Sequence, residues 1–121
     1  MKKMNSFPHI TIIAMAGTLF MSANAANARP YLYLDTFSHG ASHQKCIAGA
    51  KKVLLENGFK NLDNFEQPEN RESEVSGYHK NEAMTATIEC DQKLGTTTMA
   101  VSGLDNTSTY KMYKILFNAE W

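Results

Sequence analysis

The chain of 121 residues contains only two cysteines, and its acidic and basic residues balance to a net charge of zero. Because the charges also follow no pattern, the sequence lacks the basic stripe that binds phosphates, which argues against a nucleic-acid partner. It has no C-x-x-C motif, so a redox thiol site is not expected. It also has no internal repeat or low-complexity segment. These absences point to an ordinary globular domain.

The sequence has no apolar run long enough for a transmembrane helix. The stretch Ile10–Met21 has about a dozen residues, whereas a membrane-spanning helix needs roughly 18 or more. Lys2 and Lys3 precede this stretch, and two small-x-small sites follow it, at Ala23–Ala25 and Ala26–Ala28. This order predicts a secretory signal peptide that is cleaved after one of the two sites.

We therefore expect residues 1–28 to be a cleaved signal peptide and residues 29–121 to form a single small α+β domain. The removal of two lysines leaves 93 residues with ten basic and twelve acidic side chains. A domain of this length has a thin core. The short basic leader is typical of a bacterial protein that is periplasmic or secreted, without stable membrane insertion.

In the first half of the domain, apolar residues first alternate as in a strand and then recur with the period of a helix. Residues 30–37 alternate like a strand, and we expect Leu32 and Leu34 to point inward. Ser42 can cap a helix that ends at Gly58, where glycine adopts a left-handed conformation at little cost. The apolar stripe of this helix consists of Cys46, Ile47, Ala50, Val53 and Leu54.

The middle of the domain has a polar segment followed by three alternating ones. Lys60–Arg71 is rich in asparagine and acidic residues, so a loop is expected there. Strands follow at residues 72–80, 83–91 and 96–102, with Gly95 in the hairpin turn before the last one. The inward residues of these strands are Val75, Met84, Ala86, Ile88, Cys90, Thr97, Met99 and Val101.

The last segment, residues 108–121, can be interpreted in two ways. A helix would place Met112, Ile115, Leu116 and Ala119 on the sheet and would begin at Asp105, Asn106 or Thr107. The alternative is a terminal strand, because alternate residues up to Trp121 are apolar. We favour the helix, since 93 residues cannot supply the strands of a membrane barrel.

The element order β-α-β-β-β-α predicts an α+β two-layer sandwich with two helices on one face of a mainly antiparallel, four-stranded sheet. Such a fold buries one sheet face and leaves the other open. We expect the open face to carry Tyr31, Tyr33, Ser76, Tyr78, Thr85, Thr87, Thr96 and Thr98.

Cys46 and Cys90 are both placed inward, one by the helical period and the other by strand alternation. Two cysteines in an exported protein normally form a disulfide. The bond would close a loop of about 45 residues and stabilise the fold by about 4 kcal/mol in the chain-entropy estimate. We therefore expect one structural disulfide and no free thiol.

Two groups of polar residues are candidates for metal binding or for acid–base catalysis. His39 and His43, with Cys46, could bind zinc or copper, but Cys46 is already assigned to the disulfide. Four carboxylates could serve acid–base catalysis, but they are spread over several strands without a nucleophile beside them. These are Asp35, Glu74, Glu89 and Asp91. We expect no catalytic residue, no enzyme activity and no cofactor, and keep a metal-binding protein as the alternative function.

Tyr31, Tyr33 and Tyr78 are the best candidates for a binding surface, because tyrosines on an open sheet face form an aromatic patch. The leading hypothesis is a small exported, non-enzymatic binding or interaction module that uses the open sheet face. Its partner would be another envelope protein or a second copy of the chain.

The chain also resembles small exported bacterial proteins of uncharacterised function. The resemblance rests on Cys46-x3-Ala50, Gly58-Phe59, Gly77, Ile88-x-Cys90, Gly95 and Val101-x-Gly103. It covers most of residues 29–121 and implies a fold and a disulfide. It supplies no catalytic residue.

Overall fold

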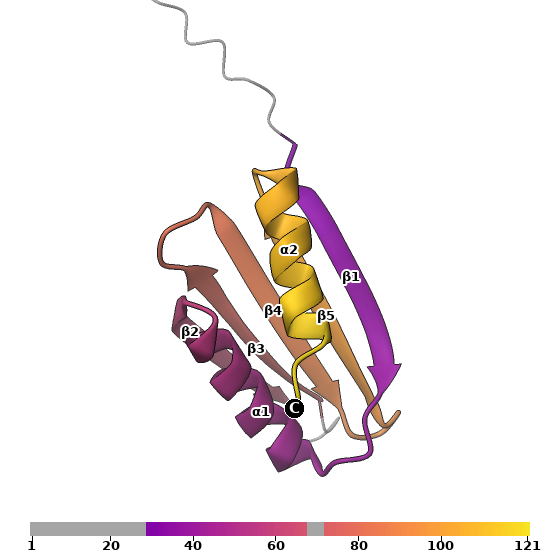
Figure 1. Cartoon of the computed structure of the whole chain (residues 1–121). Coiled ribbons are helices and arrows are strands. Elements are labelled where there is room, and N and C mark those ends of the chain that lie inside the picture. Colours follow the sequence, from indigo (N-terminus) through magenta and orange to yellow (C-terminus); the bar gives the residue numbers. More distant parts are fainter. Residues whose placement is uncertain (1–28, 68–71) are drawn as a thin grey trace, which may run out of the picture.

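The computed structural model describes residues 29–67 and 72–121, and these residues form two helices and five strands (Figure 1). The expected signal peptide, residues 1–28, lies outside the described residues. In chain order the elements are β1 Tyr31–Ser38, α1 His43–Glu56, β2 Phe59–Gln67, β3 Glu72–His79, β4 Met84–Asp91, β5 Thr96–Gly103 and α2 Asn106–Phe117.

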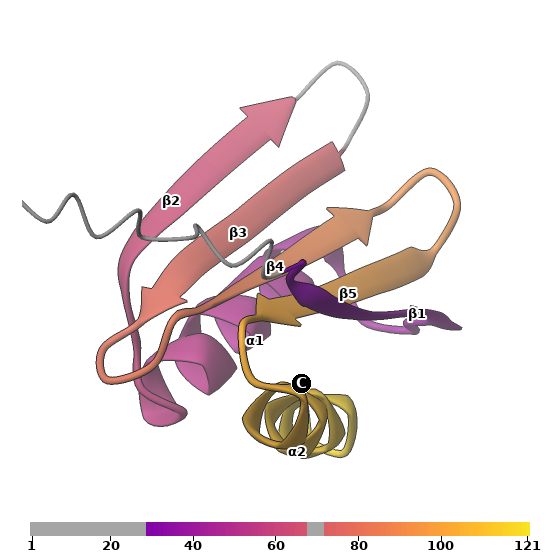
Figure 2. The same cartoon turned by 90° about the horizontal axis from the view of Figure 1, so that it is seen from above.

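The five strands form one antiparallel sheet in the order β1-β5-β4-β3-β2. The segment containing α1 carries the chain from one edge strand, β1, to the other, β2. Both helices lie on the same side of the sheet, α1 against β2, β3 and β4 and α2 against β5 and β1 (Figure 2). The predicted α+β sandwich with two helices on one face is therefore confirmed. The opposite side of the sheet is called the helix-free face below.

The predicted number of strands is wrong, because part of the expected loop Lys60–Arg71 belongs to β2. This strand pairs with β3, and a bulge between Lys60 and Asp63 interrupts the register. Asn61 in the bulge has a φ of 51°. Only Phe59 in β2 is buried, and Leu62 packs partly buried against the core, because the other residues of this edge strand are polar or exposed. The polar composition and the bulge together conceal the alternation that identifies a strand.

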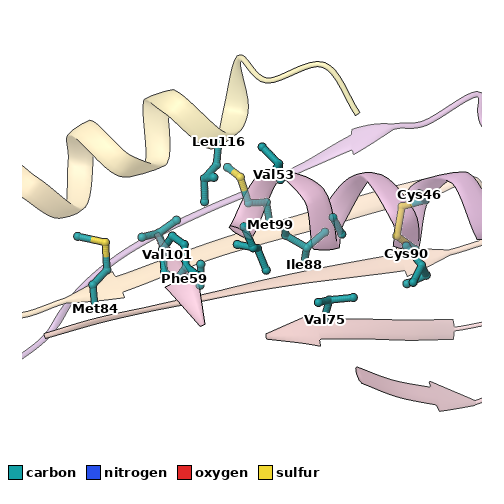
Figure 3. Close-up of a cluster of buried hydrophobic side chains, with 14 residues drawn as sticks. Cys46, Val53, Phe59, Val75, Met84, Ile88, Cys90, Met99, Val101 and Leu116 are labelled. Carbon is teal, nitrogen blue, oxygen red and sulfur yellow. A yellow bond between two sulfur atoms is a disulfide. The ribbon is translucent and has the colours of Figure 1, made fainter. Parts of the chain in front are cut away.

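The core lies between the helices and the sheet, where α1, β4 and β5 bury the residues that the sequence predicts (Figure 3). Cys46 on α1 and Cys90 on β4 form the predicted disulfide, with a Cα–Cα distance of 6.1 Å. No free cysteine remains. The predicted helix cap is also present, since the Ser42 hydroxyl accepts a hydrogen bond from the amide of Lys45.

The predicted orientation of β1 is wrong. Leu32 and Leu34 are 63% and 59% exposed on the helix-free face, whereas Tyr33 and Phe37 point toward α2. The register with β5 places Tyr33 beside the fully buried Val101. Because both faces of β1 carry large apolar side chains, alternation alone could not decide between them. The aromatic face turns inward because α2 supplies aromatic partners.

The last segment forms a helix, as expected, and not a terminal strand. Asp105 is its N-cap, and hydrogen bonds from the hydroxyl and amide of Ser108 lower the pKa of the Asp105 carboxyl below its ordinary value. The predicted buried stripe is partly wrong, since Ile115 is 39% exposed and Thr109 is buried with Leu116. Compared with the predicted stripe, α2 is rotated about its axis so that Thr109 faces β5. Gly103 on β5 has no side chain and leaves room for it.

Glycines occupy the two turns that the sequence suggested and one point where two strands come close. Gly58 and Gly95 have φ values of 85° and 67°, a region that favours glycine. A Cβ on Gly77 would meet a Leu62 side-chain atom at 2.5 Å, so β2 is the close neighbour there. No helix in the described ranges is long and apolar enough to cross a membrane.

Candidate functional site

The helix-free face is a side of the sheet that neither described helix covers. Strand pairing places side chains from all five strands in rows across it, for example Phe65, Glu74, Glu89, Thr98 and Thr36. On this face β5 contributes threonine, alanine and serine, whereas β4 contributes two threonines followed by Glu89 and Asp91. The large apolar side chains lie on β1, β2 and β3. The face therefore has a polar centre and apolar groups toward both edges.

One half of this face combines aromatic side chains with carboxylates. Phe65 on β2 and Tyr78 on β3 are 60% and 59% exposed. Among the described residues of β2, β3 and β4, five carboxylates share the face with them, and Lys60, opposite Tyr78, is the single cation. We call this part the acidic half, and it consists of Asp63, Phe65, Glu72, Glu74, Tyr78, Glu89 and Asp91.

The carboxylates of the acidic half are not neutralised within the described structure. The single ion pair in residues 29–67 and 72–121 joins Lys52 to Glu56 on α1. A hollow of about 150 Å³ lies beside the Phe65 ring, and Glu74 and Glu89 are among its lining residues. A negative field with exposed aromatic rings suits a cationic ligand that also has apolar groups.

The three candidate tyrosines do not form one surface. Tyr78 lies on the helix-free face as expected, but Tyr31 and Tyr33 point to the helix side, as the orientation of β1 requires. The Tyr33 ring lies 5.2 Å from that of Tyr110 and 5.6 Å from that of Tyr113, and its hydroxyl donates to Asn106. Tyr33 therefore fastens α2 to β1 and is not a free binding residue.

Sequence reasoning missed Phe65 as a surface residue because β2 was expected to be a loop. The sequence did contain a sign of it, since Phe65 is the only aromatic residue in the polar run Lys60–Arg71. Leu32 and Leu34 were missed because they were expected to be buried. Their exposure becomes evident only from the pairing of β1 with β5.

Among the described residues, the histidine site that the sequence suggested has no third ligand. Cys46 is bonded to Cys90 and cannot act as a thiolate. The His43 Nε2 lies 2.8 Å from the Ser73 hydroxyl oxygen, within hydrogen-bonding distance. In the described part of the chain, no three His, Cys, Asp or Glu side chains are arranged to hold a metal ion. His39 and His43 alone give the metal hypothesis no further support.

A second hollow, of about 450 Å³, lies along the flank of α1 near its N-terminus. It is lined by His43, Gln44, Ile47, Ala48, Lys51, Glu66, Ser73 and Gln92. The His43–Ser73 pair resembles a base with a nucleophile, but Ser73 is only 2% exposed, and the buried Nδ1 of His43 has no described partner to orient the ring. The contact between His43 and Ser73 is therefore better explained as a structural link between α1 and β3 than as a catalytic dyad.

These features define a small, disulfide-bonded α+β sandwich with one sheet face that no described helix covers. No protein-family model, curated protein or solved structure matches the chain.

Proposed function

We propose that this chain is a small exported, non-enzymatic protein that binds a basic partner through the acidic half of its helix-free face. The observation that carries the proposal is the exposure of Phe65 beside Glu74 and Glu89, two carboxylates that have no ion-pair partner in the described structure. The exposed ring of Tyr78 lies further along β3 on the same face. Exposed aromatic residues beside unpaired charge of one sign are typical of a protein-binding surface.

The chemistry of the face specifies the partner. A lysine or arginine side chain can lie over the ring of Phe65 and reach the carboxylate of Glu74, which lies opposite Phe65 on β3. Each cation–π contact at an exposed site contributes about 0.5–1 kcal/mol. The carboxylates also attract a basic partner over roughly 8 Å at physiological ionic strength. A basic segment with interspersed apolar residues therefore fits this surface best.

Two further observations support export. The N-terminal lysines and the short apolar stretch have the pattern of a secretory signal peptide. The disulfide between Cys46 and Cys90 is typical of proteins in an oxidising compartment. In such a compartment the partner would be another envelope or extracellular protein.

A fluorescent hexapeptide of alternating lysine and leucine tests the proposal by anisotropy titration. The Phe65→Ser/Tyr78→Ser variant should bind it about tenfold more weakly than the wild type, since two anchors of roughly 0.7 kcal/mol each are lost. The matched control is Leu55→Ser, which removes a side chain that is 58% exposed on α1. Equal affinity of the wild type for a glutamate–leucine hexapeptide, or equal loss in both variants, would contradict the proposal.

A further inference from the structure

The two edges of the sheet differ in how well they resist pairing with another strand. The edge strand β2 has a bulge at Asn61 and charged residues along its length, devices that disfavour edge-to-edge contact. The edge strand β1 has neither a bulge nor a lysine, and all eight of its residues pair regularly with β5. Its only charged residue is Asp35. The edge of β1 is therefore open to strand addition.

The backbone of β1 has hydrogen-bonding groups that point away from the sheet. The amide of His39 donates to the carbonyl oxygen of Gly95 at 3.0 Å, which continues the ladder with β5. Residues of an antiparallel ladder alternate, so the odd-numbered residues of β1 bond to β5 and the even-numbered ones face the edge. The amide of Thr36 faces this edge and donates to the side-chain Oδ1 of Asp35 at 2.8 Å, a bond that it must exchange when a strand is added. Leu32 and Leu34 present the adjacent outward groups.

Exposed apolar side chains border this edge on both faces of the sheet. Leu32 and Leu34 are 63% and 59% exposed on the helix-free face. On the helix side, Tyr31 is 46% exposed, and the exposed rings of Tyr110 and Phe117 lie on α2, which packs over β1. A strand added at β1 would cover apolar surface on both sides, which raises the gain from pairing.

We infer that β1 pairs antiparallel with β1 of a second copy of this chain, about a two-fold axis at Leu34. Leu34 then lies opposite its own copy, Tyr31 lies opposite Phe37, and Asp35 lies opposite the tyrosine at position 33. This register overlaps seven residues of each β1. An axis at Asp35 would oppose two like charges, which is destabilising, and an axis at Tyr33 would overlap only five residues.

The same geometry explains why assembly stops at two copies. A two-fold pairing consumes the β1 edge of both chains and leaves only the two β2 edges outside. Because the bulge and charges of β2 resist pairing, no further copy is added, and the dimer has one open sheet of ten strands instead of a fibre. The inference goes beyond the proposed function, because it depends on Leu32 and Leu34 and not on Phe65 and Tyr78.

Analytical ultracentrifugation of the purified, disulfide-intact protein between 1 µM and 1 mM tests the inference. The wild type should sediment as a monomer–dimer equilibrium, and Leu34→Lys should raise the dimer dissociation constant at least tenfold. The matched control, Phe65→Lys, places the same charge on the β2 edge and should leave dimerisation unchanged. A wild type that stays monomeric throughout, or a Leu34→Lys variant that dimerises like the wild type, would overturn the inference.

A cross-linking measurement covers the case in which Leu34→Lys fails to fold. Opposed residues of an antiparallel pair have Cα atoms about 4.5–5.5 Å apart, within the range that a disulfide spans. Leu34→Cys should therefore oxidise to a covalent dimer, whereas Thr87→Cys on the central strand β4 should not. Equal cross-linking of both variants would count against the register. Peptide binding by Leu34→Lys reports separately on the acidic half.

Discussion

The hydroxyl of Tyr113 on α2 donates a hydrogen bond to the Oδ2 of Asp35 on β1 at 3.1 Å. Desolvation of the phenol, and then the hydrogen bond to Asp35 and its charge, raise the pKa of Tyr113 above its ordinary value of about 10. Asp35 in turn accepts from the amide of Thr36 at the outer edge of the sheet. One carboxylate thus connects the second helix to the edge strand.

This contact predicts a pH dependence of stability. Because the folded pKa of Tyr113 is raised, its contribution is complete below pH 10 and is lost as the pH rises through the folded value. Tyr113→Phe should cost about 1 kcal/mol of unfolding free energy at pH 8, and the difference from wild type should shrink above pH 10. Urea unfolding at pH 8 and pH 10.5 measures both values. A difference that stays constant with pH would refute the role of the phenol.

The corrected orientation of β1 predicts unequal effects of two adjacent truncations. Tyr33→Ala removes a ring that stacks on Tyr113 and contacts Tyr110 at a tilted angle, so it should destabilise the fold by about 2 kcal/mol. Leu34→Ala removes an exposed side chain and should change stability by less than about 0.5 kcal/mol. Denaturant unfolding at a protein concentration low enough to keep the chain monomeric compares them. A larger loss of stability in Leu34→Ala than in Tyr33→Ala would instead support an inward orientation of the leucines.

The disulfide predicts a redox-sensitive stability. The Cys46→Ala/Cys90→Ala variant should lose about 4 kcal/mol relative to the oxidised wild type, since the unfolded chain is no longer closed into a loop. Unfolding with and without a thiol reductant provides the control, because reduction should affect only the wild type. Thiol labelling of the native protein should find no free cysteine, and two labelled cysteines would disprove the bond.

The close approach of α2 to β5 predicts a coupled pair of substitutions. A Cβ at Gly103 would collide with the Thr109 hydroxyl oxygen, so Gly103→Ala should cost about 2 kcal/mol. Adding Thr109→Ala removes the obstructing hydroxyl and should recover part of that loss, with a coupling energy of about 1 kcal/mol. A double-mutant cycle by denaturant unfolding measures the coupling. Strictly additive losses would show that the two residues do not meet.

Most of the core could be predicted from the sequence because its strands bury one face only. In β4, buried Ile88 alternates with the half-buried Thr87 and Glu89, so the inward face is unambiguous. In β1, Leu34 and Tyr33 are both apolar, and only the position of α2 decides which one is buried. Local alternation cannot report a partner that lies about 80 residues away in the sequence.

The candidate site was only partly predictable for a related physical reason. Tyr78 was placed correctly, because β3 has a clear inward residue in Val75 and its other face follows by alternation. Phe65 was not placed, because an exposed edge strand with a bulge buries too little to leave a hydrophobic pattern. The acidic half becomes visible only when strand pairing brings β2 beside β3.

The central claim is that the acidic half of the helix-free face binds a basic partner, and amide chemical-shift mapping tests it most directly. The disulfide-intact protein is titrated with the lysine–leucine hexapeptide at 50 mM and 300 mM salt. We predict shifts concentrated on β2, β3 and β4 around Phe65, Tyr78 and Glu74, with weaker binding at the higher salt concentration. Shifts confined to the hollow beside α1, or no shifts at millimolar peptide, would contradict the claim.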